Sequence, residues 1–204
     1  MKRSDWNARY AERDLVWGEE ANRFVAEELG EQAATGRALD LACGEGRNAV
    51  WLAERGWEVT AVDFSDVALE RGRRLQARRG VEVDWLCEDL SNYEPPTGAF
   101  GLVLISYLQL PGAERRSVLE RAAPALVSGG ELFMIGHARC NLGRGVGGPR
   151  DPTVLWTPDE IADELESLDL QVERCEHVQR SVETPDGVRP AFDVLARAIS
   201  ITRA

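Results

Sequence analysis

A short apolar strand that runs directly into a glycine turn restricts this chain to a small set of folds. Residues 38–42 have the pattern of a buried strand, Gly44 and Gly46 follow, and a helical pattern covers residues 46–55. The glycines allow the backbone to approach a bound molecule closely, and the start of the helix offers unpaired N–H groups. This unit predicts an α/β fold in which a ligand binds beyond the carboxyl end of the strand.

Strand and helix patterns alternate along the rest of the chain. Strand patterns recur at 57–62, 81–86, 100–105 and about 131–136, and helical patterns cover 4–30 (with a break near Trp17), 65–79 and 113–127. Ser65 is a candidate N-cap, and Thr157 and Glu160 form a capping-box pair around Pro158. A turn at 185–187 predicts a hairpin between strands at about 170–180 and 190–199. We therefore expect a Rossmann-like three-layer sandwich, with a seven-stranded, mostly parallel sheet whose last strand is antiparallel.

The charge of the chain argues against one broad class of partner. Asp and Glu number 35 against 24 Lys and Arg, which gives a net charge of −11 at pH 7. Because a chain this acidic repels the phosphate backbone, we do not expect it to bind nucleic acid.

Other features of the sequence bear on its compartment. No stretch approaches the roughly 20 consecutive apolar residues that span a bilayer, and the N-terminus is too polar for a signal peptide. The cysteines Cys43, Cys87, Cys140 and Cys175 are scattered, without a spacing typical of zinc ligands. We expect free, mostly buried thiols, no metal and no membrane partner, in a cytoplasmic protein that is a monomer or a homodimer.

An acidic residue at the end of the second strand narrows the ligand class. Asp63 lies 17 residues beyond Gly46, and a carboxylate there can accept hydrogen bonds from both hydroxyls of a ribose. Taken alone, the glycines could form an ordinary tight turn and Asp63 could cap a helix. The combination favours a nucleoside-type ligand.

Two nucleoside ligands compete for this turn. Gly44, Gly46 and Ala49 fit the loose dinucleotide pattern GxGxx(G/A). Asp40, however, lies inside the strand just before the turn, where its charge would repel a pyrophosphate and attract a cationic or amino-bearing ligand. S-adenosylmethionine carries both a sulfonium and an ammonium group, so Asp40 favours this ligand.

The segments DLACGEGRN and VDFS closely resemble the first two motifs of class I S-adenosylmethionine-dependent methyltransferases. Within that class, the pattern GxGRNAxxLAxxG and the WNxRY…WG start look like the tellurite-resistance and thiopurine methyltransferase-like small-molecule enzymes. The resemblance covers about residues 5–136 well and the remainder in architecture only. Ala42 departs from the glycine that is more usual at its position.

The resemblance implies a site for S-adenosylmethionine and for its product S-adenosylhomocysteine. Asp63 would hold the ribose, Asp89 would meet the adenine amino group, and an N-terminal helix would close over the cofactor. Anchoring of that helix to the core is the alternative for its aromatic residues. The expected cofactor residues are Tyr10, Trp17, Asp40, Ala42, Gly44, Gly46, Asn48, Asp63, Phe64, Glu88, Asp89, Leu90 and Ser106.

Few residues are candidates for the chemistry of methyl transfer. A sulfonium is already a good leaving group, so catalysis rests on alignment, and a base is required only when the nucleophile arrives protonated. His137, after the fifth strand, is the candidate base or acceptor-orienting residue, and Tyr107 follows the fourth strand. A hydrogen-bonded strand-end histidine and a core tyrosine are the alternatives.

The longest stretch without a regular pattern covers residues 138–156, and long loops are often functional lids. Arg144 and Arg150 give this loop a positive bias, and Trp156 could pack over a flat acceptor. These three residues form the expected binding site for a small, anionic acceptor. A mobile glycine loop with solvated arginines is the alternative.

The sequence thus predicts a methyltransferase that acts on a small molecule and uses S-adenosylmethionine. We expect one domain over 1–204, with an N-terminal helical cap at 1–35, a cofactor-binding core at 36–136, and a substrate loop with the terminal hairpin at 137–204. An NAD-dependent oxidoreductase and a non-catalytic protein that binds S-adenosylmethionine or S-adenosylhomocysteine are the alternatives.

Overall fold

The computed structural model describes residues 2–12, 15–34 and 36–201. The chain divides into two compact units, the first comprising Met1–Glu94 with Ala99–Leu104 and the second Pro95–Gly98 with Ile105–Ala204. The boundary between them falls within β4 (Phe100–Ser106). The single domain expected from the sequence therefore stays a prediction.

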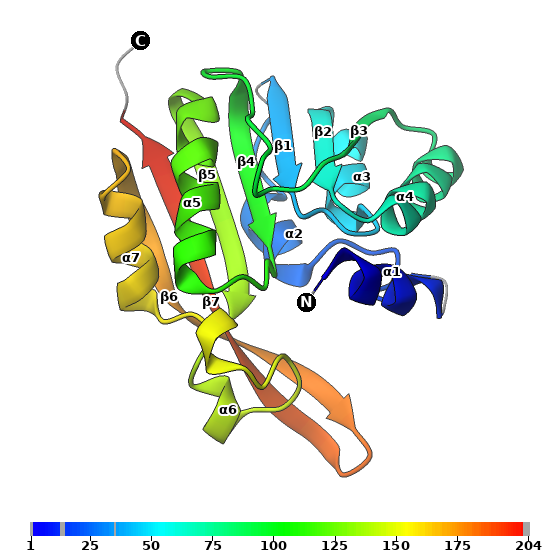
Figure 1. Ribbon diagram of the computed structural model, residues 1–204, viewed down its shortest axis with the longest axis vertical. Helices are drawn as coiled ribbons and strands as arrows, with labels where there is room; N and C mark the ends of the chain where they lie inside the picture. Colours follow the sequence, from blue (N-terminus) through cyan, green and yellow to red (C-terminus); the bar gives the residue numbers. More distant parts are fainter. Residues whose placement is uncertain (1, 13–14, 35, 202–204) are drawn as a thin grey trace. The chain divides into compact units, whose positions relative to one another are not determined.

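Among the described residues, seven strands form one sheet in the order β3-β2-β1-β4-β5-β7-β6 (Figure 1). β1 (Arg37–Leu41), β2 (Glu58–Asp63) and β3 (Val83–Cys87) pair in parallel. β7 (Gly187–Ser200) runs antiparallel to both β5 (Leu126–His137) and β6 (Leu170–Thr184). This topology confirms the predicted Rossmann-like α/β class, including the antiparallel last strand.

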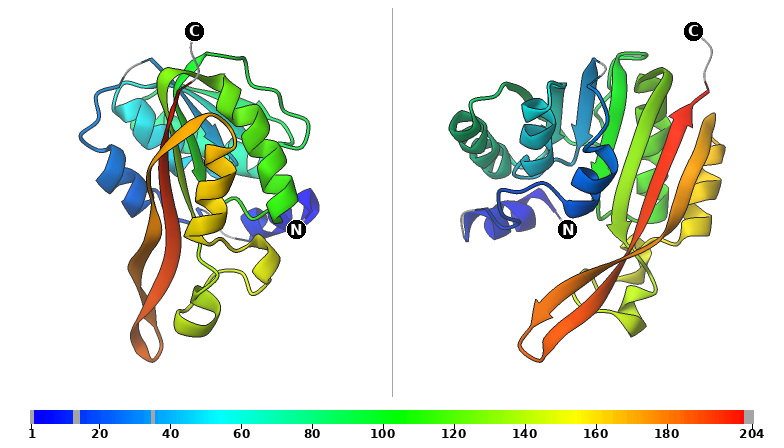
Figure 2. Two further views of the ribbon diagram at one scale, coloured as in Figure 1. Left: turned by 90° about the vertical axis from the view of Figure 1, so that its left-hand side faces the viewer. Right: turned by 180° about the vertical axis from the view of Figure 1, so that it is seen from behind.

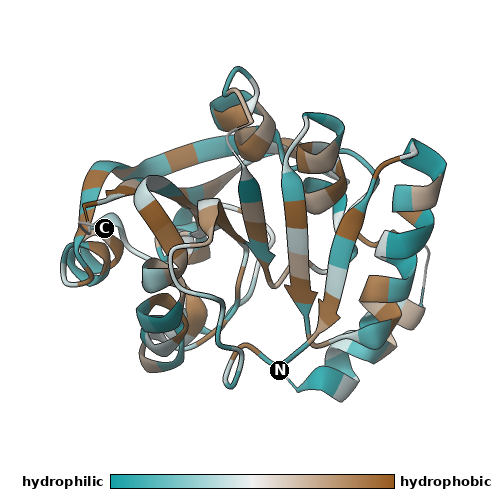
Figure 3. Ribbon diagram, turned by 90° about the horizontal axis from the view of Figure 1, so that it is seen from above, coloured by the Kyte–Doolittle hydropathy of each residue, from teal (hydrophilic) through white to brown (hydrophobic). Residues whose placement is uncertain are grey.

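The helices of the first unit begin close to the expected positions. They are α1 (Arg3–Ala11), α2 (Arg23–Leu29), α3 (Arg47–Glu54) and α4 (Asp66–Arg79). The Ser65 side chain accepts a hydrogen bond from the Ala68 N–H at 3.1 Å, which confirms Ser65 as the N-cap of α4. α4 buries Leu69 and Leu75 and exposes hydrophilic residues on its other side (Figure 3). Its apolar stripe is what holds it on the sheet.

Trp85 on β3 packs against two glycines that come from different elements. A Cβ atom at Gly72, within α4, would lie 2.5 Å from the Trp85 ring, and one at Gly46 would overlap the same ring. The Trp85 indole N–H donates a hydrogen bond of 2.6 Å to the Gln76 side chain, which fixes the ring in place. The Trp85 ring thus packs against the glycine turn and leaves no room for a side chain at Gly46.

The second unit differs from the expectation at the end of its first helix. α5 (Gly112–Ala122) stops before the predicted end at 127, and Ala123–Ala125 form a 3₁₀ turn. Pro124 explains the difference, because proline has no N–H and its ring clashes with a continuing helix. β5 then starts at Leu126, before the predicted start at about 131. α7 (Pro158–Glu166) starts at the predicted Thr157 cap, whose hydroxyl accepts the Glu160 N–H at 3.3 Å.

The β6–β7 hairpin is longer than predicted and extends beyond β5. β6 and β7 pair from Leu170 and Ser200 to the turn at Thr184 and Gly187, whereas β5 pairs with β7 only as far as Asp193. The remainder is a twisted two-stranded ribbon (Figure 2). Such a ribbon is only marginally stable unless something packs against it.

The segment 138–156 supplies that support, although its sequence shows no regular pattern. It contains α6 (Asn141–Arg144) and a 3₁₀ turn, η2 (Pro152–Val154). The Asn141 side chain accepts the Phe192 N–H at 2.8 Å, and the Pro190 carbonyl accepts the Val146 N–H at 3.0 Å. The segment therefore covers the edge of β7 beyond the end of β5.

Two further observations concern the cysteines and the helices. All four cysteines are free, as expected, but Cys87 is exposed and the other three are half-buried, so the prediction of mostly buried thiols was wrong.

No helix within the described ranges has both the length and the apolar composition needed to cross a membrane.

The packing of Trp85 leads to a stability prediction. Although alanine is the better helix former, Gly72→Ala should lower the free energy of unfolding by about 1–3 kcal/mol, because the new methyl group overlaps the ring. Gly112→Ala, in α5 where a Cβ meets nothing closer than 3.7 Å, should change it by less than about 0.5 kcal/mol. Urea unfolding of both variants measures the difference. Equal stability of Gly72→Ala and the parent would contradict this packing.

Candidate active site

The first unit contains a buried carboxyl group without a hydrogen-bond partner. Asp40 on β1 has no exposed surface, and neither of its oxygens accepts a hydrogen bond from a described residue. Burial raises the pKa of Asp40 to about 8, and the charge of Asp63 adds to the rise. The Arg47 charge and the Ala49 N–H partly offset this rise in the pKa of Asp40, but neither completes a hydrogen bond to its carboxyl group. Because buried polar groups are almost always paired, this carboxyl group indicates a missing donor.

Asp63 ends β2 and ties the glycine turn to the next helix. Its two oxygens accept the Gly44 N–H and the Ser65 N–H, each at 2.8 Å. Burial raises the pKa of Asp63, although the backbone donors of Ser65, Gly44 and Phe64 work in the opposite direction. Each oxygen keeps a second lone pair, so a ribose hydroxyl can still be accepted. The helix-cap interpretation and the ribose interpretation are therefore compatible.

The glycine turn leaves no room for side chains on the side where α1 lies. Gly44 has φ +57°, and a Cβ there would lie 2.8 Å from the Tyr10 hydroxyl. Ala42 also adopts a left-handed conformation, with φ +58°, which explains why glycine would be easier at its position. Burial, followed by the charge of Asp63, raises the pKa of the Tyr10 hydroxyl, so it stays protonated at neutral pH.

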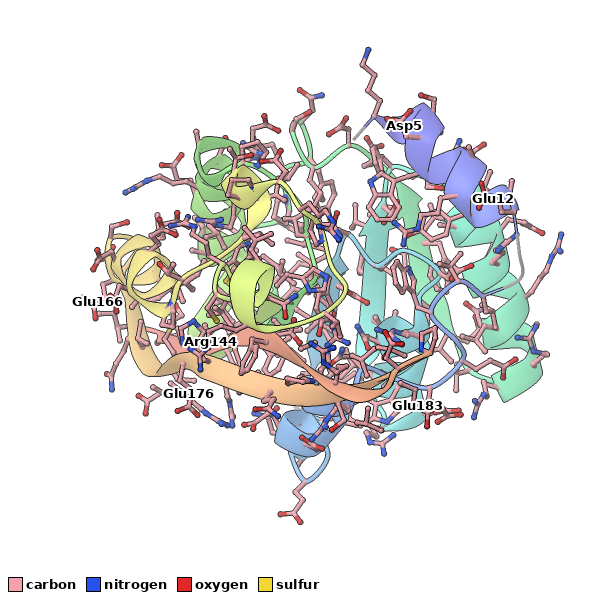
Figure 4. The ribbon with its side chains drawn as sticks, turned by 90° about the horizontal axis from the view of Figure 1, so that it is seen from below. Asp5, Glu12, Arg144, Glu166, Glu176 and Glu183 are labelled. Carbon is pink, nitrogen blue, oxygen red and sulfur yellow. The ribbon has the colours of Figure 1, made fainter. Side chains whose placement is uncertain are left out.

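The N-terminal segment is attached to this turn at several points. Asn7 accepts the Ser65 hydroxyl at 2.6 Å and donates to Asp66 at 2.9 Å, which fixes α1 to the start of α4. Asp5 on α1 and Glu12 directly after it, by contrast, are exposed (Figure 4). The Trp17 N–H donates to the buried Glu45 side chain at 3.4 Å. The described part of this N-terminal segment is thus anchored to the turn, which agrees with either interpretation of its aromatic residues.

Several other expected cofactor residues have local partners. Asn48 is buried and accepts the Asn22 N–H at 2.8 Å, so it holds the start of α2. Asp89 is exposed and accepts the Ser91 N–H at 2.9 Å. Leu90 is buried, Phe64 and Ser106 are half-buried, and Glu88 is exposed. A role of these residues toward the cofactor stays a prediction.

In the second unit, a fully buried carboxylate gathers three donors. Asp193 on β7 accepts Arg180 Nε at 2.8 Å and the Tyr107 hydroxyl at 3.0 Å, and His137 Nδ1 lies 3.1 Å from its other oxygen. The register sets part of this arrangement, since His137 of β5 and Val178 of β6 both pair with Asp193. Burial lowers the pKa of Arg180, but Asp193 and Tyr107 outweigh it and raise the pKa above its ordinary value.

This arrangement sets the tautomer of His137. A carboxylate can only accept hydrogen bonds, so Nδ1 carries the proton in the contact with Asp193. In a neutral imidazole Nε2 is then the proton acceptor, and no described residue makes a hydrogen bond to it. His137 and Tyr107 are thus brought together by the structure, with ring centroids 4.6 Å apart.

Tyr107 adopts a conformation that bulky residues rarely take. Its φ of +57° is left-handed, and the surrounding contacts enforce it. The Tyr107 N–H donates to the Ile135 carbonyl at 2.7 Å, and its hydroxyl donates to Asp193. Strain of this kind concentrates at functional sites, so it favours a functional role for the cluster over that of a core tyrosine.

The expected acceptor-binding residues are dispersed. Trp156 has no exposed surface and packs on Gly136, so it is a core residue and does not cover a flat acceptor as expected. Arg144 is exposed and lies 5.1 Å over the Phe192 ring, and Arg150 is exposed. The structure does not gather these three residues into one site.

Sequence reasoning missed Asp193, Arg180 and Glu45. Asp193 and Arg180 lie 13 residues apart on the two strands of a hairpin, and only the register of that hairpin brings them together. The available signal was that Val178, Arg180 and Val182 occupy every second position of β6, so that an arginine shares one face of the strand with two valines. Glu45 pairs with Arg71 at 3.0 Å, a contact between a turn and a distant helix that no local pattern reveals.

Comparisons with known proteins agree with this geometry. Residues 38–130 match the family described as Methyltransferase domain. Demethylmenaquinone methyltransferase of Thermus thermophilus is 36% identical over 124 residues, 60% of this chain and 54% of that protein. The chain thus spans about half the length of that relative.

Two solved structures share the fold. The N-methyltransferase NodS of Bradyrhizobium japonicum, in complex with S-adenosyl-L-homocysteine, has a TM-score of 0.75 and 18% identity, over 99% of this chain and 100% of that one. The 1,6-didemethyltoxoflavin-N1-methyltransferase of Burkholderia thailandensis has a TM-score of 0.74 and 20% identity, over 98% and 87%. The match over residues 38–130 agrees with the methyltransferase resemblance that the glycine turn predicts, and the two solved structures show that the fold is shared.

The buried Asp40 leads to a prediction for the protein without ligand. Its pKa of about 8 lies above the roughly 3.9 of an unfolded aspartate, so the folded state holds a proton that the unfolded chain releases between these values. The stability that this proton provides is present below about pH 4 and is lost as pH rises toward about 8. Asp40→Asn removes the linkage, so its stability relative to the parent should rise by up to about 1.4 kcal/mol per pH unit in this range.

Urea unfolding of Asp40→Asn and the parent at pH 5, 6 and 7 measures this difference. Asp84→Asn, an exposed aspartate of β3, serves as the control and should show no such trend. A difference between Asp40→Asn and the parent that is constant across these pH values would contradict the burial of an unpaired carboxyl group.

Proposed function

We propose that this methyltransferase uses S-adenosylmethionine to methylate a small-molecule acceptor, with His137 as the base that removes the acceptor proton. The observation that carries the proposal is the unpaired, buried Asp40 beside a glycine turn. When bound, S-adenosylmethionine supplies a methyl group activated on a sulfonium.

The residues of the first unit suit this cofactor better than a dinucleotide. A cationic ligand would pair with Asp40 and restore its charge, whereas a pyrophosphate would favour the uncharged form of Asp40 and would be repelled by nearby Asp63. The narrow turn at Gly44 and Gly46 allows the backbone close to the ligand, and Asp63 keeps lone pairs for ribose hydroxyls. These features support S-adenosylmethionine over NAD.

The second unit supports catalysis beyond binding. Asp193 orients His137 so that Nε2 can take a proton, and Arg180 and Tyr107 hold Asp193 in turn. A base of this kind is useful only when the acceptor arrives protonated, as a hydroxyl does. We therefore favour an acceptor hydroxyl over a free amine, and an enzyme over a non-catalytic binder of S-adenosylmethionine.

The size and location of the acceptor are also part of the proposal. The relatives named for demethylmenaquinone and 1,6-didemethyltoxoflavin support a small molecule. Four free cysteines favour a reducing, cytoplasmic compartment.

Transfer of a radioactive methyl group tests the function directly. The protein is incubated with methyl-labelled S-adenosylmethionine and with small phenols, amines and thiols, and separately with transfer RNA and a mixed protein substrate. Label in a small phenol is the expected result. Binding of S-adenosylhomocysteine without any transfer would support the non-catalytic alternative, and stabilisation by NAD alone would overturn the cofactor assignment.

Two substitutions of His137 separate its two nitrogen atoms. His137→Asn keeps a donor where Nδ1 meets Asp193 but removes the proton acceptor, so kcat should fall by about 10²–10⁴-fold. His137→Gln places its amide farther out and loses the contact with Asp193. Calorimetric titration with S-adenosylhomocysteine is the control, and its Kd should be unchanged in both variants. Parent-like kcat in His137→Asn would rule out the base.

A further inference from the structure

One face of the β6–β7 hairpin continues from the His137–Asp193 pair beyond the end of β5. In register, Val178 is opposite Asp193, Arg180 opposite Ala191, and Val182 opposite Arg189. Opposite residues of an antiparallel pair project from the same face, and alternate residues along a strand share it. We call these six residues the hairpin face.

The charges on the hairpin face do not cancel. Asp193 is buried and is compensated by Arg180, whose Nε lies 2.8 Å away. Arg189 is exposed, and its side chain makes no ion pair or hydrogen bond with a described residue. Since the remaining members are apolar, the face carries one surplus positive charge at its outer end. This is the reverse of the net charge of −11 of the whole chain.

Each charged member of the face has an apolar residue opposite it in register. Val178 and Val182 are half-buried and Ala191 is buried. Two residues along a strand span about 7 Å, so Arg189 lies two such steps from Asp193 along β7. A molecule that reaches from His137 to Arg189 would therefore lie along apolar surface and meet a cation at its far end.

We propose that the hairpin face binds an acceptor with a hydroxyl at one end and a carboxylate at the other. The hydroxyl would meet His137 Nε2, the apolar body would lie on the half-buried Val178 and Val182, and the carboxylate would pair with the Arg189 guanidinium, which matches carboxylate geometry. This inference rests on the proposed function, because it names the acceptor of that reaction.

Arg144, one of the two loop arginines expected from the sequence, belongs to a different surface. Phe192 neighbours Asp193 along β7 and therefore projects from the opposite face of the ribbon. Arg144 stacks on the Phe192 ring at 5.1 Å and lies on α6 beside the hairpin (Figure 4). Arg144 and Arg189 are thus competing candidates that substitution can separate.

Calorimetric titration with a matched pair of probes tests the proposal. The probes are para-hydroxyphenylpropanoate and its neutral primary amide, each added to protein saturated with S-adenosylhomocysteine. The carboxylate should bind roughly tenfold more tightly than the amide, as expected of one additional ion pair. Arg189→Gln should abolish this preference by weakening carboxylate binding alone. Arg174→Gln, on β6 opposite Arg197 at the other end of the hairpin, is the matched control and should keep the preference.

Each of the other outcomes overturns the proposal. They are equal affinity for the two probes, binding of neither, persistence of the preference in Arg189→Gln, and loss of it in Arg144→Gln with Arg189→Gln unaffected. Failure of the proposed function is seen separately, as absence of S-adenosylhomocysteine binding or of methyl transfer to any acceptor. Transfer to neutral phenols with no preference for the carboxylate would leave the function standing and remove this inference.

Discussion

The first unit is organised around an electrostatic conflict between two buried carboxyl groups. Asp40 has no hydrogen-bond partner among the described residues, and Asp63 lies close enough to raise the pKa of Asp40 further. Backbone donors of the glycine turn compensate Asp63 but not Asp40. Burial without a partner costs stability, and such a cost persists in proteins mainly where a ligand removes it. The cationic part of S-adenosylmethionine would do so.

The contacts around the turn keep this arrangement from relaxing. Trp85 closes one side, where a side chain on Gly46 would overlap its ring, and Tyr10 closes the other at Gly44. The glycine turn therefore cannot accommodate larger side chains without displacing a packed aromatic ring. A ligand can bind such a rigid site without the free-energy cost of rearranging it first.

The functional cluster of the second unit is built on an antiparallel hairpin, whereas the glycine turn of the first unit follows a parallel strand. Register alone places His137, Asp193 and Val178 side by side, and a strained Tyr107 completes the cluster. Because β5 ends at His137, the β6–β7 ribbon beyond this residue has no third strand beside it and presents the hairpin face. The Asn141 side chain supports one edge of this ribbon. The same hairpin can thus orient a base and present a binding surface.

The sequence predicted the parts of this structure that depend on local chemistry. The Ser65 and Thr157 caps, the glycine turn and the hairpin turn follow from residues that are close in sequence. Pro124 was a local signal that the helix over 113–127 should have stopped early. What could not be predicted depends on long-range contacts: the Asp193 cluster, the burial of Trp156 and the order in 138–156. Composition indicated a loop there, but hydrogen bonds from β7 made it a defined support.

The most direct test of this account is the number of protons released when S-adenosylhomocysteine binds. Calorimetric titrations at pH 7 in buffers with different ionisation enthalpies give this number. Because Asp40, with a pKa of about 8, is mostly protonated in the free protein and should ionise against the ligand ammonium, the account predicts release of close to one proton. Asp40→Asn should release none. Binding of the ligand to the parent protein without proton release would contradict the central role of Asp40.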